Sequence, residues 1–305
     1  MNIASIDIGT NTVLMLIANI SKDDKTIKPL LNEYRMPRIG KGLIPGGEIN
    51  KDSIIRLFDV IEIYADIIKN YNCEKVIAKG TSALRLASNS NDIINEIKDR
   101  FGIEVEIISG TEEARLSYLG SISAFNSANN IVIDIGGGST EVIFGTDKSI
   151  TYSKSFEAGA VNLTENLLKN DPPNNKELKE LFNRINNVFA ELTNRFPSDA
   201  LVIAVAGTPT SLSCIKQGLT IYDEEKVEGS VLYKDELRNF VSHLSKMSHS
   251  EIKSKYQEIV NGRDDIILAG TAILFLISEI LNVKDIAVSG RGIRFGSIID
   301  YLDKL

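Results

Sequence analysis

The chain has 305 residues, 43% of them hydrophobic, and carries 34 basic against 41 acidic residues, a net charge of -7. This length and hydrophobic content predict a globular protein of two domains. The acidic balance, without any basic run, argues against nucleic acid as a partner. The longest apolar stretch, residues 266–277, is too short to cross a bilayer and predicts a buried helix. Because the N-terminus also lacks a signal-peptide pattern, we expect a cytoplasmic protein with no membrane partner.

The first part of the chain alternates between strand and helix patterns. A helix is expected at 51–71, where apolar residues recur at helical spacing after Asp52 and Ser53, which can cap it. The later strands are separated by helices, which favours parallel pairing. The five expected strands are residues 2–9, 12–20, 26–35, 75–80 and 103–109.

From about residue 131 the same order of elements begins again. Helices are expected at 161–169 and 174–195. The second set of strands is expected at residues 130–136, 140–145, 149–156, 200–207 and 285–290. The chain is therefore predicted to be a duplicated α/β unit, because a repeat this long exceeds the period of a solenoid. We place the domains at 1–122 and 123–292, and consider that a C-terminal helix, 293–305, packs back on the first domain.

One phrase occurs in both halves: "IDIGTNT" at 6–12 and "IDIGGGST" at 133–140. A glycine after a buried strand allows a phosphate to approach the backbone N–H groups, and hydroxyl side chains add donors. A single copy would more simply be a hairpin turn. Two copies in the same register predict two phosphate loops that face each other across a cleft. The predicted phosphate-binding residues are Gly9, Thr10, Asn11, Thr12, Gly136, Gly137, Gly138, Ser139 and Thr140.

Carboxylates accompany both loops. Asp7 and Asp134 end equivalent strands, and they are expected to hold Mg²⁺, or another divalent cation, through oxygen ligands and water. Glu141 closes the second loop and could join the metal shell. Its alternative is an ordinary strand residue that faces solvent.

With these motifs in order, the chain resembles the exopolyphosphatase and guanosine pentaphosphate phosphohydrolase (Ppx/GppA) family over residues 3 to about 297. The resemblance implies the duplicated actin-like ATPase superfold of actin, sugar kinases and heat-shock chaperones, with two ribonuclease H-like domains flanking a cleft. The matching segments, besides the two loops, are "RIGKGL" (38–43), "GTSALRLASN" (80–89), "ISGTEEARLSYLG" (108–120), "SFEAGAVNLTE" (155–165), "GRDDIILAGTAIL" (262–274) and "SGRGIRFG" (289–296).

The segment "SGTEEAR" holds the candidate catalytic glutamate. Ser109 and Glu112 have the spacing of a capping box, which gives Glu112 a structural task and leaves Glu113 for general-base catalysis. The resemblance also implies that the catalytic base is the glutamate before Ala-Arg, which is Glu113. Without that context, Glu113 would be an ordinary first-turn glutamate favoured by the helix dipole. We assign Glu113 as the base, with Glu112 as the second choice.

Four arginines stand beside glycine or hydroxyl residues. Their planar forks suit phosphate oxygens. Arg38 and Arg85 match the family's segments and are predicted to bind phosphate, whereas Arg291 and Arg294 flank the last glycine turn. Leu14 stands in a region where members of the family often carry a basic residue, so one phosphate contact can be missing.

The predicted reaction is metal-assisted hydrolysis of terminal phosphoanhydride bonds. The substrate would be inorganic polyphosphate, cut from its end, or the 5' γ-phosphate of guanosine pentaphosphate. The alternatives are an ATP-dependent sugar or acid kinase of the same superfold and a non-catalytic nucleotide-binding assembly module. Longer relatives add a histidine-aspartate metal domain, which two histidines cannot form here. The sequence does not distinguish a homodimer from a monomer.

Overall fold

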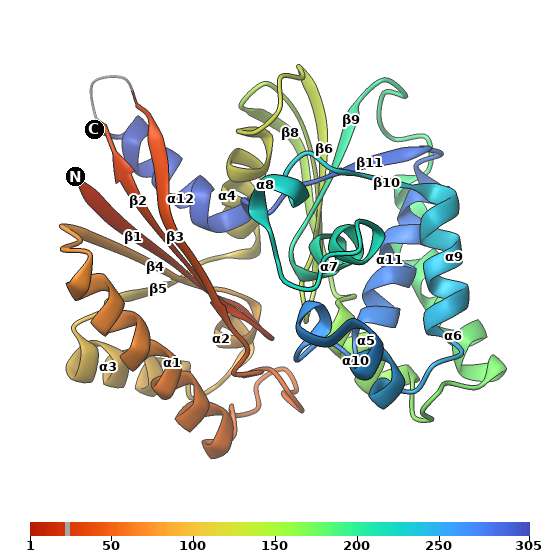
Figure 1. Ribbon diagram of the computed structural model, residues 1–305, viewed down its shortest axis with the longest axis horizontal. Helices are drawn as coiled ribbons and strands as arrows, with labels where there is room; N and C mark the ends of the chain where they lie inside the picture. Colours follow the sequence, from red (N-terminus) through yellow and green to blue (C-terminus); the bar gives the residue numbers. More distant parts are fainter. Residues whose placement is uncertain (22–24) are drawn as a thin grey trace. The chain divides into compact units, whose positions relative to one another are not determined.

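Two β-sheets, one in each half of the sequence, organise the chain (Figure 1). The computed structural model describes residues 1–21 and 25–305 and divides into two compact units. Unit 1 comprises Met1–Gly120 together with Ile293–Leu305, and unit 2 comprises Ser121–Gly292. The chain thus leaves unit 1 once and returns to it in its last helix.

The sheet of unit 1 has the strand order β3-β2-β1-β4-β5. The first three strands form an antiparallel meander, and β4 and β5 add in parallel to β1. Because both faces are covered, β1 and β2 are hydrophobic on both sides. The strands are β1 Asn2–Ile8, β2 Val13–Ile20, β3 Ile27–Arg35, β4 Lys75–Gly80 and β5 Val105–Ile107.

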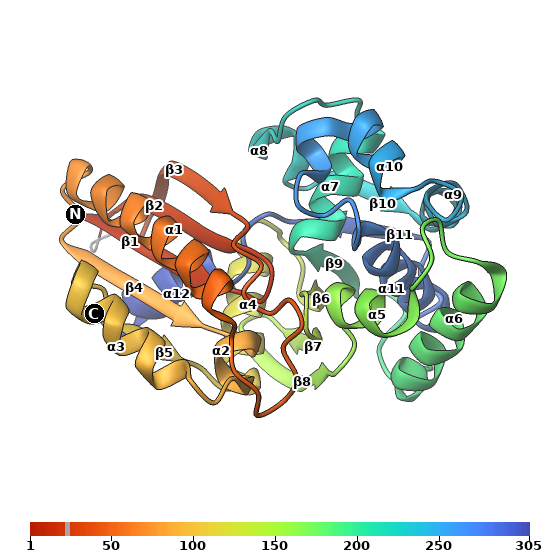
Figure 2. The same cartoon turned by 90° about the horizontal axis from the view of Figure 1, so that it is seen from below.

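Helices pack on both faces of this sheet. Leu57 and Ile61 of α1, and Ile93 of α3, pack with the face that carries Ile6. The opposite face packs against α12 in a separate cluster (Figure 2). The helices of unit 1 are α1 Lys51–Asn70, α2 Ser82–Leu86, α3 Ser90–Phe101, α4 Gly110–Ile122, whose last turn enters unit 2, and α12 Gly292–Asp303.

The sheet of unit 2 repeats this order as β8-β7-β6-β9-β11 and adds β10 at its edge, antiparallel to β11. The pairing directions of β6, β7, β8 and β9 match those of β1, β2, β3 and β4. This repeated ribonuclease H-like order confirms the predicted α/β class and the duplicated actin-like superfold. The strands are β6 Asn129–Ile135, β7 Thr140–Thr146, β8 Ser149–Phe156, β9 Leu201–Val205, β10 Val231–Tyr233 and β11 Asp285–Val288.

The core of unit 2 forms around α11, the apolar segment predicted as a buried helix. Ile273 and Ile277 of α11 are fully buried with Leu181 of α6 and Ile133 of β6. The helices are α5 Ala160–Leu167, α6 Asn175–Phe189, α7 Gly207–Lys216, α8 Glu224–Val227, α9 Lys234–Leu244, α10 His249–Tyr256 and α11 Ile267–Ile280, with short 3-10 turns at Ala190–Leu192 and Gln257–Val260. Within the described ranges, no helix combines the length and the apolar character needed to cross a bilayer.

Two local expectations need correction. The first helix is capped by Asn50, whose side chain accepts the N–H of Ser53 at 2.9 Å, and not by Asp52 or Ser53. The segment expected as one helix over 174–195 is α6, which ends at Phe189 and continues as a 3-10 turn.

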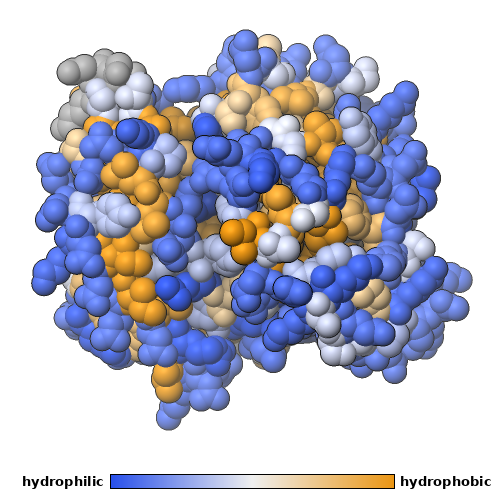
Figure 3. Space-filling view, viewed as in Figure 1, coloured by the Kyte–Doolittle hydropathy of each residue, from blue (hydrophilic) through white to orange (hydrophobic). Residues whose placement is uncertain are grey.

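Hydrophobic side chains are also exposed on unit 1. Figure 3 shows a band of them where Figure 1 draws β3 and α1. Leu30 and Tyr34 of β3 and Ile55 and Ile63 of α1 are each exposed by more than a third. Since β3 is an edge strand, Pro29 within it removes a donor that another strand could use.

Candidate functional site

The first predicted phosphate loop is the turn between β1 and β2. The N–H of Gly9 donates to the carbonyl of Thr12 at 3.0 Å, and a Cβ on Gly9 would lie only 2.9 Å from that oxygen. Glycine is therefore required for the turn to close. Asn11 is buried, and Thr10 and Thr12 are partly exposed at the tip.

The segment that contains Arg38 supports this turn from outside the sheet. The N–H of Arg38 donates to the carbonyl of Asn11 at 3.1 Å, and that of Gly40 donates to Thr10 at 2.9 Å. Arg38 has φ +55, a left-handed conformation that is costly for a residue with a side chain. The surrounding contacts thus hold this arginine beside the turn, and its predicted role in phosphate binding stays a prediction.

Three parallel strands of unit 1 end at the same edge of the sheet. The N–H of Thr81, after β4, donates to Ile8 of β1 at 3.1 Å, and the N–H of Ile108, after β5, donates to Gly80 of β4 at 3.0 Å. The first loop, α2 and the start of α4 therefore meet at the carboxyl ends of β1, β4 and β5. Ligands bind at this position in open α/β sheets.

Glu113, the predicted base, lies at this edge in an ion pair with Arg85. Nη1 of Arg85 donates to Oε2 of Glu113 at 2.8 Å and to the carbonyl of Ile108 at 3.0 Å. Glu113 is only 7% exposed, so its carboxylate depends on this charged partner and on the N-terminus of α4. The structure thus brings the predicted base together with one of the two predicted phosphate-binding arginines of unit 1.

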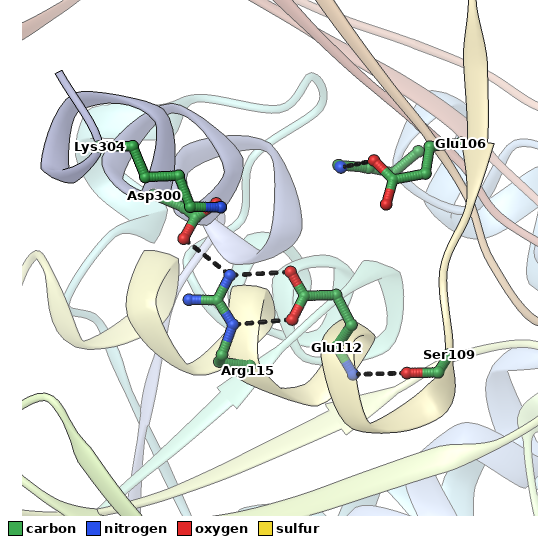
Figure 4. Close-up of polar contacts among 7 residues, drawn as sticks. Glu106, Ser109, Glu112, Arg115, Asp300 and Lys304 are labelled. Carbon is green, nitrogen blue, oxygen red and sulfur yellow. Dashed lines mark hydrogen bonds and ion pairs between the residues drawn. The ribbon is translucent and has the colours of Figure 1, made fainter.

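Glu112 has a different environment (Figure 4). Its N–H donates to Oγ of Ser109 at 3.2 Å, which is half of the predicted capping box. The other half of the capping box, in which the Glu112 carboxylate would accept the N–H of Ser109, was predicted wrongly. The carboxylate instead accepts two hydrogen bonds of 2.8 Å from Arg115. The hydrogen bonds from Arg115 lower the pKa of Glu112. This geometry favours Glu113 over Glu112 as the base.

The second loop repeats the first turn in unit 2. The N–H of Gly136 donates to the carbonyl of Ser139 at 2.9 Å, and a Cβ on Gly136 would lie 3.0 Å from that oxygen. In the described part of the chain, no carbonyl accepts from the N–H groups of Gly137 or Gly138. Backbone donors of this kind suit a phosphate. Thr140 differs from the expectation, since its buried hydroxyl donates to the carbonyl of Ala158 at 2.6 Å and supports the loop.

The N-terminus of α5 holds the second loop. Ala160 and Val161 donate their N–H groups to loop carbonyls at 3.0 and 2.8 Å, and the Asn162 amide donates to a third at 2.6 Å. At Gly159 a Cβ would lie 2.5 to 2.6 Å from backbone carbons of the loop. The backbone of residues 136–138 is therefore fixed by direct contact with a helix.

The predicted metal ligands of unit 2 lie opposite each other on neighbouring strands. Asp134 of β6 pairs with Glu141 of β7, which pairs with Ser155 of β8, so the three side chains share one face of the sheet. Glu141 is 1% exposed and accepts the Ser155 hydroxyl at 2.6 Å. Two adjacent carboxylates, one of them buried, fit a hard divalent cation that keeps several waters. In unit 1, Asp7 pairs with Leu14 at the equivalent register, so a second carboxylate is replaced by an apolar side chain.

No set of three or more His, Cys, Asp or Glu side chains is arranged as a metal site within residues 1–21 and 25–305. The metal assignment therefore remains a prediction.

The arginines of the last glycine turn have contacts within their own units. Nη1 of Arg291 donates to Oγ of Ser123 at 3.0 Å. Arg294 is nearly buried in unit 1, where Nη1 donates to Oδ1 of Asn32 at 2.7 Å. Arg294 thus joins α12 to β3.

No sequence pattern indicates a role for Glu228, which lies outside every motif. Its carboxylate accepts the Ser289 hydroxyl at 2.7 Å and the Gly290 N–H at 2.8 Å, at the end of β11. Burial raises the pKa of Glu228, although these hydrogen bonds partly oppose the shift. Its partners lie about 60 residues away in the sequence, so no local pattern could predict the contact.

Comparison with known proteins gives independent information on the family of the chain. Residues 16–305 match the model of the Ppx/GppA phosphatase family. The chain belongs to this family. The match confirms the predicted family and the prediction of a phosphate-releasing hydrolase, and it does not favour the kinase or assembly-module alternatives.

Individual relatives are similar over nearly the whole chain. A bifunctional 3-dehydroquinate synthase/phosphatase of Fusobacterium nucleatum is 30% identical over 97% of this chain, which spans only 46% of that relative. Exopolyphosphatase 2 of Mycobacterium tuberculosis is 28% identical over 89% of the chain and 88% of its own length. The crystal structure of the Aquifex aeolicus Ppx/GppA family member superposes with a TM-score of 0.84, at 30% identity, over 100% of this chain and 98% of that one.

Proposed function

We propose that the chain hydrolyses terminal phosphoanhydride bonds and releases orthophosphate from the end of inorganic polyphosphate, from the 5' γ-position of guanosine pentaphosphate, or from both. The carrying observation is Glu113, a buried carboxylate paired with Arg85 at the sheet edge beside the first glycine turn. The family and the name of the mycobacterial relative support the proposal. Polyphosphate and the nucleotide share the chemistry of a terminal phosphoryl group.

In the proposed reaction, Glu113 takes a proton from a water molecule that attacks the terminal phosphorus. Arg85 orients the carboxylate. Its other nitrogen atoms are proposed to bind a phosphate oxygen, which suits the planar guanidinium. The turns at 9–12 and 136–139 and the side chain of Arg38 supply further donors, so that negative charge on the equatorial oxygens is met by fixed groups.

A divalent cation, Mg²⁺ or a similar ion, would be held by the neighbouring carboxylates Asp134 and Glu141 of unit 2. Asp7, at the equivalent register of unit 1, is a further candidate ligand. When bound, it would neutralise charge on the phosphate oxygens. The role of the chain itself is to present these carboxylates, and the hydroxyl of Ser155 keeps one oxygen of Glu141 in place.

Partners and location are also proposals. The net charge of -7 makes nucleic acid an unsuitable partner, and we place the protein in the cytoplasm without a membrane partner. A homodimer is proposed as an alternative to the monomer, and sedimentation analysis of the purified protein would distinguish them.

The test is phosphate release from polyphosphate and from guanosine pentaphosphate, assayed side by side with the purified protein. We expect hydrolysis that stops in excess chelator and returns with Mg²⁺. The matched variant Glu113→Gln keeps the shape of the side chain, and its turnover should fall by about 10² to 10⁴, the contribution of a general base. A wild-type protein that releases no phosphate from either substrate contradicts the proposed function, and a Glu113→Gln variant with wild-type turnover removes Glu113 from the mechanism.

A further inference from the structure

Two glutamates stand side by side in the first turn of α4, and their environments differ. Successive helix positions point about 100° apart, so Glu112 and Glu113 face different neighbours. The side chain of Glu113 is 9% exposed and reaches Arg85 on α2, whereas that of Glu112 is 33% exposed and turns to Arg115 on its own helix. A site that uses one carboxylate as a base thus has a second carboxylate directly beside it.

Arg115 holds this second carboxylate with both ends of its fork. Nε and Nη2 of Arg115 donate to the two oxygens of Glu112 at 2.8 Å each, and Nη2 also donates to Asp300 of α12 at 2.7 Å (Figure 4). Asp300 in turn accepts Lys304 at 2.6 Å. Burial raises the pKa of Asp300, but the hydrogen bonds from Lys304 and Arg115 outweigh it and the pKa is lowered. The guanidinium is therefore fixed from two helices.

The other charge near Glu112 comes from the sheet. Lys79 of β4 contributes a weak attraction to Glu112, but the Lys79 ammonium is already paired with Glu106 of β5. Arg115 is thus the principal cation that neutralises Glu112. Without it, Glu112 would keep only the weak attraction of Lys79 and would be a free carboxylate one residue from the base.

We propose that Arg115 is a positioning residue that restrains Glu112, so that Glu113 alone occupies Arg85 and anionic substrate meets no extra negative charge. The inference rests on the proposed function. Arg115 has no role in proton transfer here; it acts on the reaction through the neighbouring carboxylate. A bidentate guanidinium suits this task better than an ammonium, because only the fork fixes both carboxylate oxygens.

The test compares kcat and KM of Arg115→Gln with those of the double variant Glu112→Gln/Arg115→Gln. Both are assayed with the substrate that the wild type hydrolyses faster. For Arg115→Gln we expect kcat to fall about tenfold, which corresponds to about 1.4 kcal/mol in the barrier, and KM to rise. Removing the Glu112 charge in the double variant should restore both parameters to within about threefold of wild type. Arg115→Lys, which keeps the charge but loses the fork, should be intermediate.

A purely structural role for Arg115 predicts a different pattern. If the ion pairs serve only to join α4 and α12, the double variant will be no more active than Arg115→Gln, and Asp300→Asn will lower activity as much as Arg115→Gln does. We expect Asp300→Asn to retain near wild-type kcat, because the pair between Arg115 and Glu112 persists. Failure of rescue while the wild type is active and Glu113→Gln is inactive overturns this inference and leaves the proposed function intact.

Discussion

The two glycine turns are closed by the same backbone hydrogen bond, but the side chains on the strands beside them differ in chemistry. In both, the first glycine donates to a carbonyl three residues later, at 3.0 Å in unit 1 and 2.9 Å in unit 2. Across the three antiparallel strands, the row in unit 1 is Asp7, Leu14 and Tyr34. The row in unit 2 is Asp134, Glu141 and Ser155. Duplication preserved the turn, and the neighbouring strands set what each turn can bind.

The supports of the two turns differ as well. An irregular loop with Arg38 in a left-handed conformation supports the turn of unit 1, whereas the N-terminus of α5 supports that of unit 2. Glu113, the proposed base, and its partner Arg85 lie beside the first turn, and the carboxylate pair of Asp134 and Glu141 lies beside the second. On the proposed function, this contrast predicts a division of tasks, with proton transfer in unit 1 and most of the cation binding in unit 2.

The largest effect is expected from substitutions that remove a carboxylate beside the turn of unit 2. Asp134→Asn and Glu141→Gln should each lower turnover at limiting Mg²⁺ by roughly 10² or more, the loss typical of one stabilising group, and raised Mg²⁺ should recover part of it. Asp7→Asn should raise the required Mg²⁺ less, because Asp7 has no carboxylate opposite it. Titrating activity against Mg²⁺ for the three variants and Leu14→Gln measures this. Equal Mg²⁺ requirements in Asp7→Asn and Asp134→Asn would refute the division of tasks.

A smaller effect separates the supports of the two turns. In Gly159→Ala the new methyl group meets backbone of residues 137 and 138, which cannot yield, so we expect a loss of about 1 to 3 kcal/mol of stability and reduced activity. In Gly40→Ala the methyl group meets mainly Thr10 Cγ2, the end of a side chain that can rotate. Chemical denaturation of both variants, and of Gly40→Ala with Thr10→Ser, tests this. The prediction is wrong if Gly40→Ala is the more damaging change or if Thr10→Ser fails to relieve it.

The smallest expected effect is on how the stability of each unit depends on pH. The pKa values of Glu112 and Asp300 in unit 1 are lowered from the ordinary 4.5 and 3.8. The stability that these two ionised carboxylates contribute is fully present above the ordinary pKa values. It is lost as the pH falls through the lower pKa values of the folded protein. The pKa of Glu228 in unit 2 is raised from the ordinary 4.5, so its ionised form costs stability above that value and this cost disappears on acidification.

Glu228→Gln should therefore raise the free energy of unfolding at pH 7 by up to about 1 kcal/mol, with no gain at pH 4. Urea unfolding at both pH values checks the sign. Asp300→Asn serves as the control from unit 1, with a loss at pH 7 that shrinks toward pH 3. A Glu228→Gln variant that is less stable at neutral pH would show that the hydrogen bonds to Ser289 and Gly290 outweigh desolvation of the charge.

The sequence predicted most strands and both turns because these depend on local patterns. Alternating and continuous apolar runs mark β1, β2, β6 and β7, and the glycines that close the turns can be identified directly in the sequence. The apolar run that became α11 is long and uninterrupted by charge, so its burial followed from composition alone.

The remainder depends on contacts between distant residues. The pairing of Arg85 with Glu113 joins residues 28 apart, and that of Arg115 with Asp300 joins residues 185 apart. The predicted capping box fails for a local reason, because Arg115, three residues further on, binds the Glu112 carboxylate. Short elements such as α8 and β10 have too few residues for a periodic pattern, and the structure places them where the sequence predicted none.

Helix α12 has a consequence for synthesis of the chain. Ile3, Leu16 and Ala18 lie on the sheet face that Phe295 and Ile298 of α12 cover, and all of unit 2 is encoded between them. At about 5 to 20 residues per second, translation of residues 121–292 takes roughly 10 to 30 seconds, during which this face of the nascent chain has no partner. Unit 2, continuous in sequence, can fold on the ribosome first, while unit 1 must wait as an open half-structure that general chaperones can bind.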